Sequence, residues 1–238
     1  MIKAKEKPII FSTGLIPAIQ NLKPGTWPPE PIDPGKPWKW QTRRTGGLEE
    51  VNNNNMTWEL KNTGTLDYMV KKQYKGRFGA YFHSEQIGDK TLYVCPQVCP
   101  YPPGMILYVR ETWQDLSNDK GEYVYLADGD KGLFNKDWGV ITTKDIKWCP
   151  SIHMPRAAAR LFLEVKSARP ERVQDITEED ARAEGILPDT PFKDMGYQWT
   201  ARDNFIELWD TLYAKRGYPW ENNDWVWVYE FMRTEARP

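Results

Sequence analysis

Short apolar runs and short amphipathic stretches follow one another along this chain, and long periodic segments are rare. An apolar run predicts a strand at about residues 8–11, and an amphipathic stretch predicts a short helix at 15–20. Residues 21–40 hold six prolines and three tryptophans, a density at which regular elements do not form. We therefore expect a loop with polyproline II segments, which its tryptophans can pin in place.

The middle of the chain reads as an insertion followed by strands. Residues 45–79 are polar and rich in glycine and asparagine, which predicts an insertion with weak strands or a helix around 56–73. Residues 80–114 are β-rich, and a Pro-Pro-Gly turn precedes a strand at 105–109. Alternating apolar positions predict another strand at 122–127.

The last third carries helix-start signals. Thr177 and Thr200 are each followed three positions later by an aspartate, the pattern of an N-cap, and Gly185 suits the position just past the first of these helices. A short helix is expected at 154–160. An apolar segment at 224–231 predicts a closing strand.

Interleaved strands and short helices indicate an α+β fold. We expect one domain over residues 1–238, built around a small β-barrel with flanking short helices. Residues 161–173 form one long strand of it or a strand pair, and loop insertions lie at about 21–38 and 45–79.

Composition narrows the class of protein. The chain has 238 residues, 27% of them charged, and a formal net charge of −1, which argues against a protein that coats a nucleic-acid backbone but leaves recognition of a single nucleoside open. We see neither the apolar run of about 20 residues that a membrane span needs nor a secretory signal. Three cysteines suggest a reducing, cytoplasmic setting. Twelve tryptophans suggest a thick core or a pocket that stacks on flat ligands.

The first candidate site is the segment from Lys39 to Arg44. A lysine wedged among indoles loses charge, because burial lowers its pKa. Neutral Lys39 could then take the proton of the Thr42 hydroxyl, while Arg44 binds a carbonyl or anionic oxygen and Trp40 offers a stacking surface. The alternative is a solvated basic loop.

Glu184 is the second candidate. It closes the predicted helix just before Gly185, and a carboxylate at a helix C-terminus is unfavourable, which tends to raise its pKa and suits proton exchange. The alternative is an exposed surface glutamate.

Two further polar segments could line a pocket. Arg110, Glu111 and Trp113 follow an apolar strand, where pocket residues often lie, although a plain surface ion pair explains the first two equally well. His153 and Arg156 lie in a polar turn that could bind an oxygen-rich ligand or simply cap the fold.

Sulfur and imidazole groups give a weaker signal. Cys95, Cys99, Cys149 and His153 are four potential zinc ligands, but their spacing is looser than that of common zinc sites. We expect buried thiols rather than a metal site, and no cofactor.

As a set, several segments resemble the ASCH domain family of the PUA-like superfamily, particularly its larger phage and prophage members. The family's hallmark is a Gly-x-Lys-x-x-Glu-x-Arg loop; here Lys39 and Arg44 match, Thr42 stands in place of the Glu, and Pro37 replaces the Gly. The segments that carry the resemblance are 7–13, 39–44, 99–113, 150–160, 175–186, 208–220 and 225–231.

The threonine variant of this loop is similar to that of small bacterial ASCH enzymes that hydrolyse N4-acetylcytidine with a lysine, a threonine and a downstream glutamate. The resemblance implies that Lys39, Thr42 and Glu184 are catalytic, Glu184 by helping proton movement or holding Lys39. It implies an amidohydrolase acting on an N4-acylated cytosine nucleoside or base, with Trp40 or Trp113 stacking on the base. The alternative is a non-catalytic module that binds modified bases or RNA; polymeric nucleic acid is possible but not favoured, and no membrane partner is expected.

Overall fold

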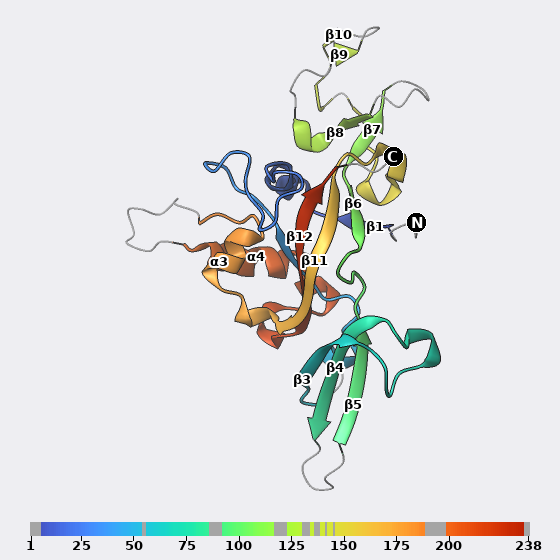
Figure 1. Cartoon of the computed structure of the whole chain (residues 1–238). Helices are drawn as coiled ribbons and strands as arrows, with labels where there is room; N and C mark the ends of the chain where they lie inside the picture. Colours follow the sequence, from blue (N-terminus) through green and yellow to red (C-terminus); the bar gives the residue numbers. More distant parts are fainter. Residues whose placement is uncertain are drawn as a thin grey trace. The chain divides into compact units, whose positions relative to one another are not determined.

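The computed structural model describes residues 6–53, 56–85, 92–116, 123–129, 134–135, 139–140, 142–144, 146–188 and 199–235. The chain divides into two units. The first consists of residues 1–40, 105–164 and 232–238, and the second of 41–104 and 165–231. The expected single domain stays a prediction, and each unit is described by itself (Figure 1).

The first unit contains the strand order β1-β6-β11. Strand β1 (Glu6–Ile10) runs parallel to β6 (Ile106–Arg110), and β6 pairs in antiparallel fashion with the start of β11 (Phe162–Arg172). The expected strand at 8–11, the helix at 15–20 and the strand at 105–109 are confirmed to within a few residues. The other described elements of this unit are η1 (Thr13–Leu15), α1 (Ile16–Gln20), β7 (Trp113–Asp115), β8 (Tyr123–Tyr125), η3 (Leu126–Asp128), β9 (Phe134–Asn135), β10 (Gly139–Val140), η4 (Ser151–His153) and η5 (Arg156–Ala158).

The proline-rich segment 21–40 of this unit is a loop, as its composition predicts. Backbone hydrogen bonds from Lys23 to Glu30 at 2.9 Å and from Ile32 to Asn21 at 2.6 Å hold this loop. The Asn21 side-chain amide adds to them by donating to the carbonyl oxygens of Asp33, Lys36 and Pro37 at 2.9–3.3 Å. The prediction of a helix at 154–160 is wrong. Only the three-residue 3-10 turn η5 forms there, and the backbone at Ala159 is already extended.

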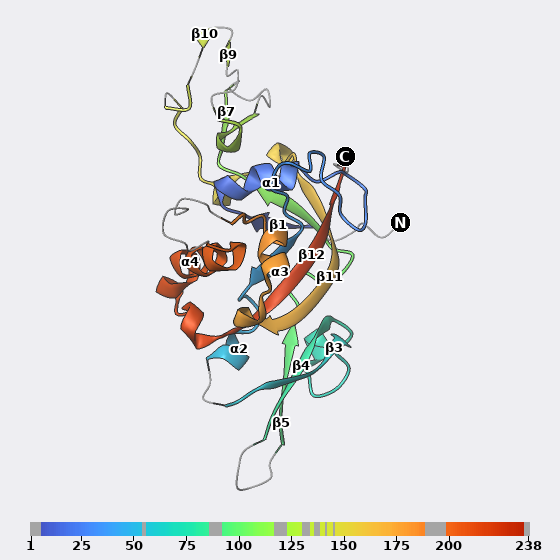
Figure 2. The same ribbon diagram turned by 90° about the vertical axis from the view of Figure 1, so that its left-hand side faces the viewer.

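The second unit contains the order β11-β12-β2, formed by the rest of β11, by β12 (Trp225–Thr234) up to Phe231 and by β2 (Gln41–Arg44). Helices α3 (Glu178–Ala183) and α4 (Ala201–Tyr213) lie beside β12 (Figure 2). Their apolar faces form one buried cluster with Val226 and Val228. The remaining elements are α2 (Glu49–Asn52), β3 (Glu59–Thr65), η2 (Lys72–Tyr74), β4 (Phe78–Glu85), β5 (Leu92–Val98), η6 (Val173–Asp175), η8 (Ala214–Arg216) and η9 (Trp220–Asn222).

The expected α+β class is confirmed: the structure is mixed, mostly sheet with a few short helices. Strands β3, β4 and β5 form an antiparallel sheet of their own from the expected insertion and the segment after it. Within the described ranges no sheet closes on itself. None of the helices in the described part of the chain has the length and apolarity needed to cross a membrane.

Candidate functional site

Strand β2 holds Thr42 in a fixed register. Thr42 lies opposite Tyr229 of β12, with Arg43 opposite Val228 and Gln41 opposite Glu230. Because successive side chains of a strand point to opposite faces, Gln41 and Arg43 share one face and Thr42 shares the other with Arg44. Thr42 is 4% exposed and therefore buried.

Arg43 is the centre of an ion-pair cluster on its face of β2. Its side chain is fully buried and its guanidinium lies 3.1 Å from Asp180, 3.4 Å from Glu171 and 3.5 Å from Glu184. The Gln41 amide donates to Asp180 at 3.0 Å. Burial opposes ionisation of Asp180, but the Gln41 hydrogen bond and the Arg43 charge outweigh it and hold the Asp180 pKa below its ordinary value.

A second arginine extends this cluster. Arg169 pairs with Glu171 and, at 2.6 Å, with Glu230, which also accepts a hydrogen bond from the Ser167 hydroxyl at 2.7 Å. The two arginines, Arg43 and Arg169, thus bring four carboxylates together.

Helix α3 begins at a capping box and ends at Glu184. Thr177 accepts a hydrogen bond from the Asp180 N–H, and the Asp180 carboxylate accepts one from the Thr177 N–H. Glu184 is the C-cap of this short helix, and Gly185 follows with a φ of 83° in the left-handed region that glycine favours. Glu184 is 5% exposed, so its interpretation as an exposed surface residue is wrong.

The opposite face of β2 is aromatic. Tyr229 is fully buried, its ring lies 5.3 Å from that of Tyr101, and its hydroxyl accepts a weak hydrogen bond from the Cys99 thiol at 3.9 Å. Burial raises the pKa of Tyr101, an effect that the positive charge of Arg44 partly offsets. Thr42 and Arg44 therefore belong to a face lined by tyrosines, while Glu184 belongs to the face of Arg43.

Lys39 is a buried lysine of the first unit. It is 1% exposed, its ammonium nitrogen lies 5.4 Å from the centre of the Phe11 ring, and its backbone N–H donates to Ala18 at 3.0 Å. The Trp40 ring centre lies 6.4 Å from that of Trp27 and 6.4 Å from that of Trp38. The alternative interpretation of this segment as a solvated basic loop is therefore wrong.

Glu111 is also buried, but its partner is Arg160 and not Arg110. Both its oxygens accept hydrogen bonds from Arg160, at 2.8 and 3.0 Å, and Arg160 also binds Asp128 and lies 3.8 Å above the Tyr125 ring. Burial alone would lower the pKa of Arg160, but its hydrogen bonds to Glu111 and Asp128 raise it. The interpretation of Arg110 and Glu111 as a surface ion pair is therefore wrong.

The other candidates of the first unit are less enclosed. Arg110 donates to the Ile152 carbonyl oxygen at 2.9 Å, and Arg156 forms a two-point ion pair with Glu6. Trp113 is half-buried with its ring 5.5 Å from that of Tyr123, and His153 is exposed. Of the expected substrate-binding side chains, only Glu111 is fully buried, and it is held by Arg160.

The three cysteines all lie in the described part of the chain. Cys95 and Cys99 are buried, Cys149 is half-buried, and all three are free. Among the described residues, no group of three or more His, Cys, Asp or Glu side chains is arranged to hold a metal ion. Burial, followed by the nearby Glu50 charge, raises the pKa of Cys95 to about 12.

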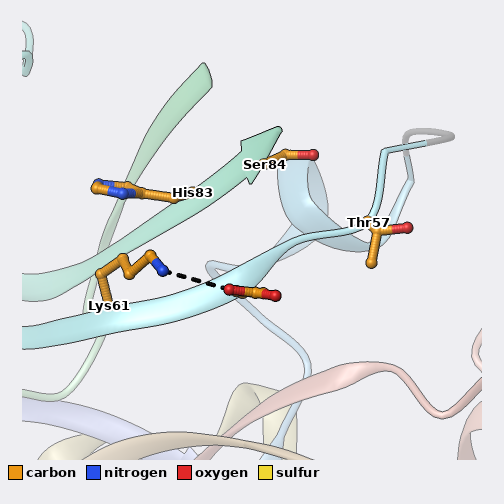
Figure 3. A pocket seen from close by; sticks show the side chains of 5 residues that line it. Thr57, Lys61, His83 and Ser84 are labelled. Atoms are coloured by element: carbon orange, nitrogen blue, oxygen red, sulfur yellow. Dashed lines mark hydrogen bonds and ion pairs between the residues drawn. The ribbon is translucent and has the colours of Figure 1, made fainter. Parts of the chain in front are cut away.

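A small polar pocket lies on the separate three-stranded sheet. It has a volume of about 200 Å³ and is lined by Thr57, Glu59, Lys61, His83 and Ser84. Figure 3 shows His83 and Lys61 next to each other, with Lys61 bound to Glu59 at 3.3 Å. The His83 Nε2 atom is buried and makes no hydrogen bond among the described residues. This volume is below the range typical of ligand pockets, about 300–1,000 Å³.

The sequence interpretation missed Arg43 and Arg160, the two arginines that hold the candidate glutamates. The sequence did hold a signal for Arg43, namely the alternation of side chains along a strand. In a strand over 41–44, Arg43 and Arg44 point to different faces.

No family model matches the chain, and neither a curated protein nor a solved structure shows significant similarity to it.

Proposed function

We propose that this protein is an amidohydrolase that removes the acyl group from N4-acylated cytosine nucleosides or bases. The observation that carries the proposal is a buried lysine and a buried threonine three residues apart: Lys39 is 1% exposed and Thr42 is 4% exposed. Three residues span at most about 11 Å between Cα atoms. We further propose that the fold is PUA-like, with a small barrel, and that the protein acts in the cytoplasm.

In the proposed mechanism, neutral Lys39 accepts the proton of the Thr42 hydroxyl as the oxygen attacks the acyl carbon. The negative charge that develops on the acyl oxygen is stabilised by Arg44 or by backbone N–H groups. The carbon–nitrogen bond then breaks, and the leaving exocyclic amine takes the proton back from Lys39. The products of this half-reaction are the free cytosine and a Thr42 acyl ester.

Water completes the cycle. Lys39, neutral again, accepts a proton from a water molecule that attacks the ester and passes it to the Thr42 oxygen. The carboxylic acid leaves and loses its proton to solvent. Glu184 assists proton movement or holds Lys39 in place, and its own carboxylate is held by the Arg43 guanidinium, 3.5 Å away. Trp40 or Trp113 supplies the surface on which the base stacks.

The test measures the release of cytidine from N4-acetylcytidine, which is monitored by chromatography. Thr42→Val and Lys39→Met keep the buried volumes but remove the nucleophile and the base, so both should lose activity by at least about a hundredfold. Thr42→Ser should retain part of it. Thr45→Ala and Lys36→Ala, which change the same residue types three positions away, are the matched controls. Full activity in Thr42→Val or in Lys39→Met would overturn the proposal.

A second candidate function is recognition of a modified base without chemistry. The observation in its favour is the tryptophan cluster, where Trp27 is 43% exposed next to Trp40. Calorimetric binding of N4-acetylcytidine by wild type with no cytidine release would support this candidate, and turnover would exclude it.

A further inference from the structure

The loop between β3 and β4 carries a concentration of exposed positive charge. Residues 66–77 contain four basic side chains and one acidic one, whereas the whole chain has a net charge of −1. The basic residues Lys71, Lys72, Lys75 and Arg77 are all exposed. None of them forms an ion pair with any residue in the described ranges.

This loop has a defined shape. Its two ends are joined by backbone hydrogen bonds from Leu66 to Arg77 at 2.8 Å and from Gly76 to Leu66 at 2.7 Å, and Leu66 itself is fully buried. A 3-10 turn, η2, places Lys72 next to Tyr74 in its middle, and the Arg77 guanidinium lies 5.7 Å from the centre of the Tyr74 ring. The four cations are therefore presented from an ordered backbone.

A rigid aromatic surface lies on the same loop. The Tyr68 ring stacks on Tyr81 with 4.3 Å between ring centres and 13° between planes, yet Tyr68 stays 46% exposed. The Tyr81 hydroxyl accepts hydrogen bonds from the Asp67 and Tyr68 N–H groups at 2.8 and 3.1 Å, which anchors the support below the ring. The outer part of Tyr68 is thus open to a flat ligand.

We propose that this Tyr-Lys loop is a docking surface for single-stranded nucleic acid. Exposed lysines and an arginine complement a phosphate backbone, and an exposed aromatic ring stacks on an unpaired base. Local charge decides such binding, so the neutral balance of the whole chain does not oppose it. The loop belongs to the insertion at 45–79, outside the segments that resemble the ASCH family, and the proposal does not depend on the amidohydrolase activity.

An anionic lipid surface is the competing occupant, because Met69 is 67% exposed beside the same lysines. Nucleic acid is favoured by the geometry of Tyr68, whose ring is fixed against Tyr81 as a flat platform. Membrane anchoring usually combines basic residues with a larger apolar surface than one methionine.

The experiment measures fluorescence anisotropy of a labelled single-stranded oligonucleotide of mixed sequence. With about four cations neutralising phosphates, the slope of log affinity against log salt should be about −3, so binding should weaken about fiftyfold between about 50 and 200 mM salt. The triple variant Lys71→Ala, Lys72→Ala, Lys75→Ala should bind at least tenfold more weakly at low salt. Its affinity should change only about threefold over the same salt range.

Matched variants separate this surface from general charge. The triple variant Lys144→Ala, Lys147→Ala, Lys215→Ala loses the same charge from exposed sites elsewhere and should bind within twofold of wild type. Tyr68→Ala should weaken binding by about tenfold with the salt slope unchanged, and Tyr68→Phe should not weaken it. Circular dichroism checks that each variant is folded.

Three results would overturn the proposal. The first is that the wild type does not bind the oligonucleotide at low salt. The second is that the two triple variants lose the same amount of oligonucleotide affinity. The third is that the protein binds phosphatidylserine vesicles but not the oligonucleotide.

Discussion

Removing the Arg43 guanidinium is the sharpest test of the cluster around Glu184. Arg43→Met keeps most of the side-chain volume but leaves three carboxylates without their shared cation. Breaking a buried ion pair by deleting one partner costs about 3–5 kcal/mol. The lower end applies here, because the Glu171 and Asp180 side chains remain 24% and 23% exposed and water can solvate them. We expect a loss of about 3 kcal/mol in the free energy of unfolding.

Thermal and urea unfolding measure this loss. For a chain of this size, about 3 kcal/mol corresponds to a Tm lower by about 6–12 °C. Arg216→Met, at an exposed arginine, is the control and should change stability by less than about 0.5 kcal/mol. The double variant Arg43→Met, Glu184→Gln should recover about 1 kcal/mol, because Glu184, at 6% side-chain exposure, is the most deeply buried of the three carboxylates.

The pH dependence gives an independent check with a definite sign. The folded-state pKa of Asp180 lies below its ordinary value, so its contribution to stability is present above that ordinary value and is lost as the pH falls through the lowered one. Arg43 is one of the causes of that lowering. The stability difference between wild type and Arg43→Met should therefore narrow below about pH 4. A loss below about 1 kcal/mol at pH 7, or a gap that widens in acid, would refute this account of the cluster.

Three further predictions concern the rest of the fold. Gly79→Ala should destabilise the protein by more than about 2 kcal/mol in urea unfolding, because a Cβ there would lie 2.2 Å from the Gln97 carbonyl oxygen. The control is Gly64→Ala, whose Cβ would meet nothing within 4 Å and which should be nearly neutral. A thiol reagent at pH 8 should modify half-buried Cys149 quickly and Cys95, with its pKa of about 12, only after unfolding; quick reaction of Cys95 in folded protein would contradict this. Thr200→Ala removes the cap of α4 and should cost about 1 kcal/mol, while Thr200→Ser should cost little.

The local elements followed from the sequence because their causes are local. The two N-caps were predicted from a threonine and an aspartate three residues apart, and both form complete capping boxes. The proline-rich loop at 21–40 was predicted from proline's missing N–H and fixed φ. The strand at 224–231 followed from its apolar run, and the structure extends it to Thr234.

The sequence also singled out Lys39, Thr42, Glu184 and Glu111 as chemically interesting, and all four are buried polar residues. What it could not supply was their neighbours. Arg43 meets Glu171 across 128 positions, and Arg160 meets Glu111 across 49, so neither pairing leaves a trace in local spacing. The Tyr68–Tyr81 stack likewise depends on the register of β3 and β4.

Propensity, capping and turn chemistry act within a few residues, so the sequence by itself located the main helices and strands to within a few residues. Burial, ion pairing and the face on which a side chain lies depend on segments that are distant along the chain. Only the tertiary structure therefore decided that Lys39 is enclosed, that Arg43 rather than Arg44 binds Glu184, and that four loop cations remain exposed.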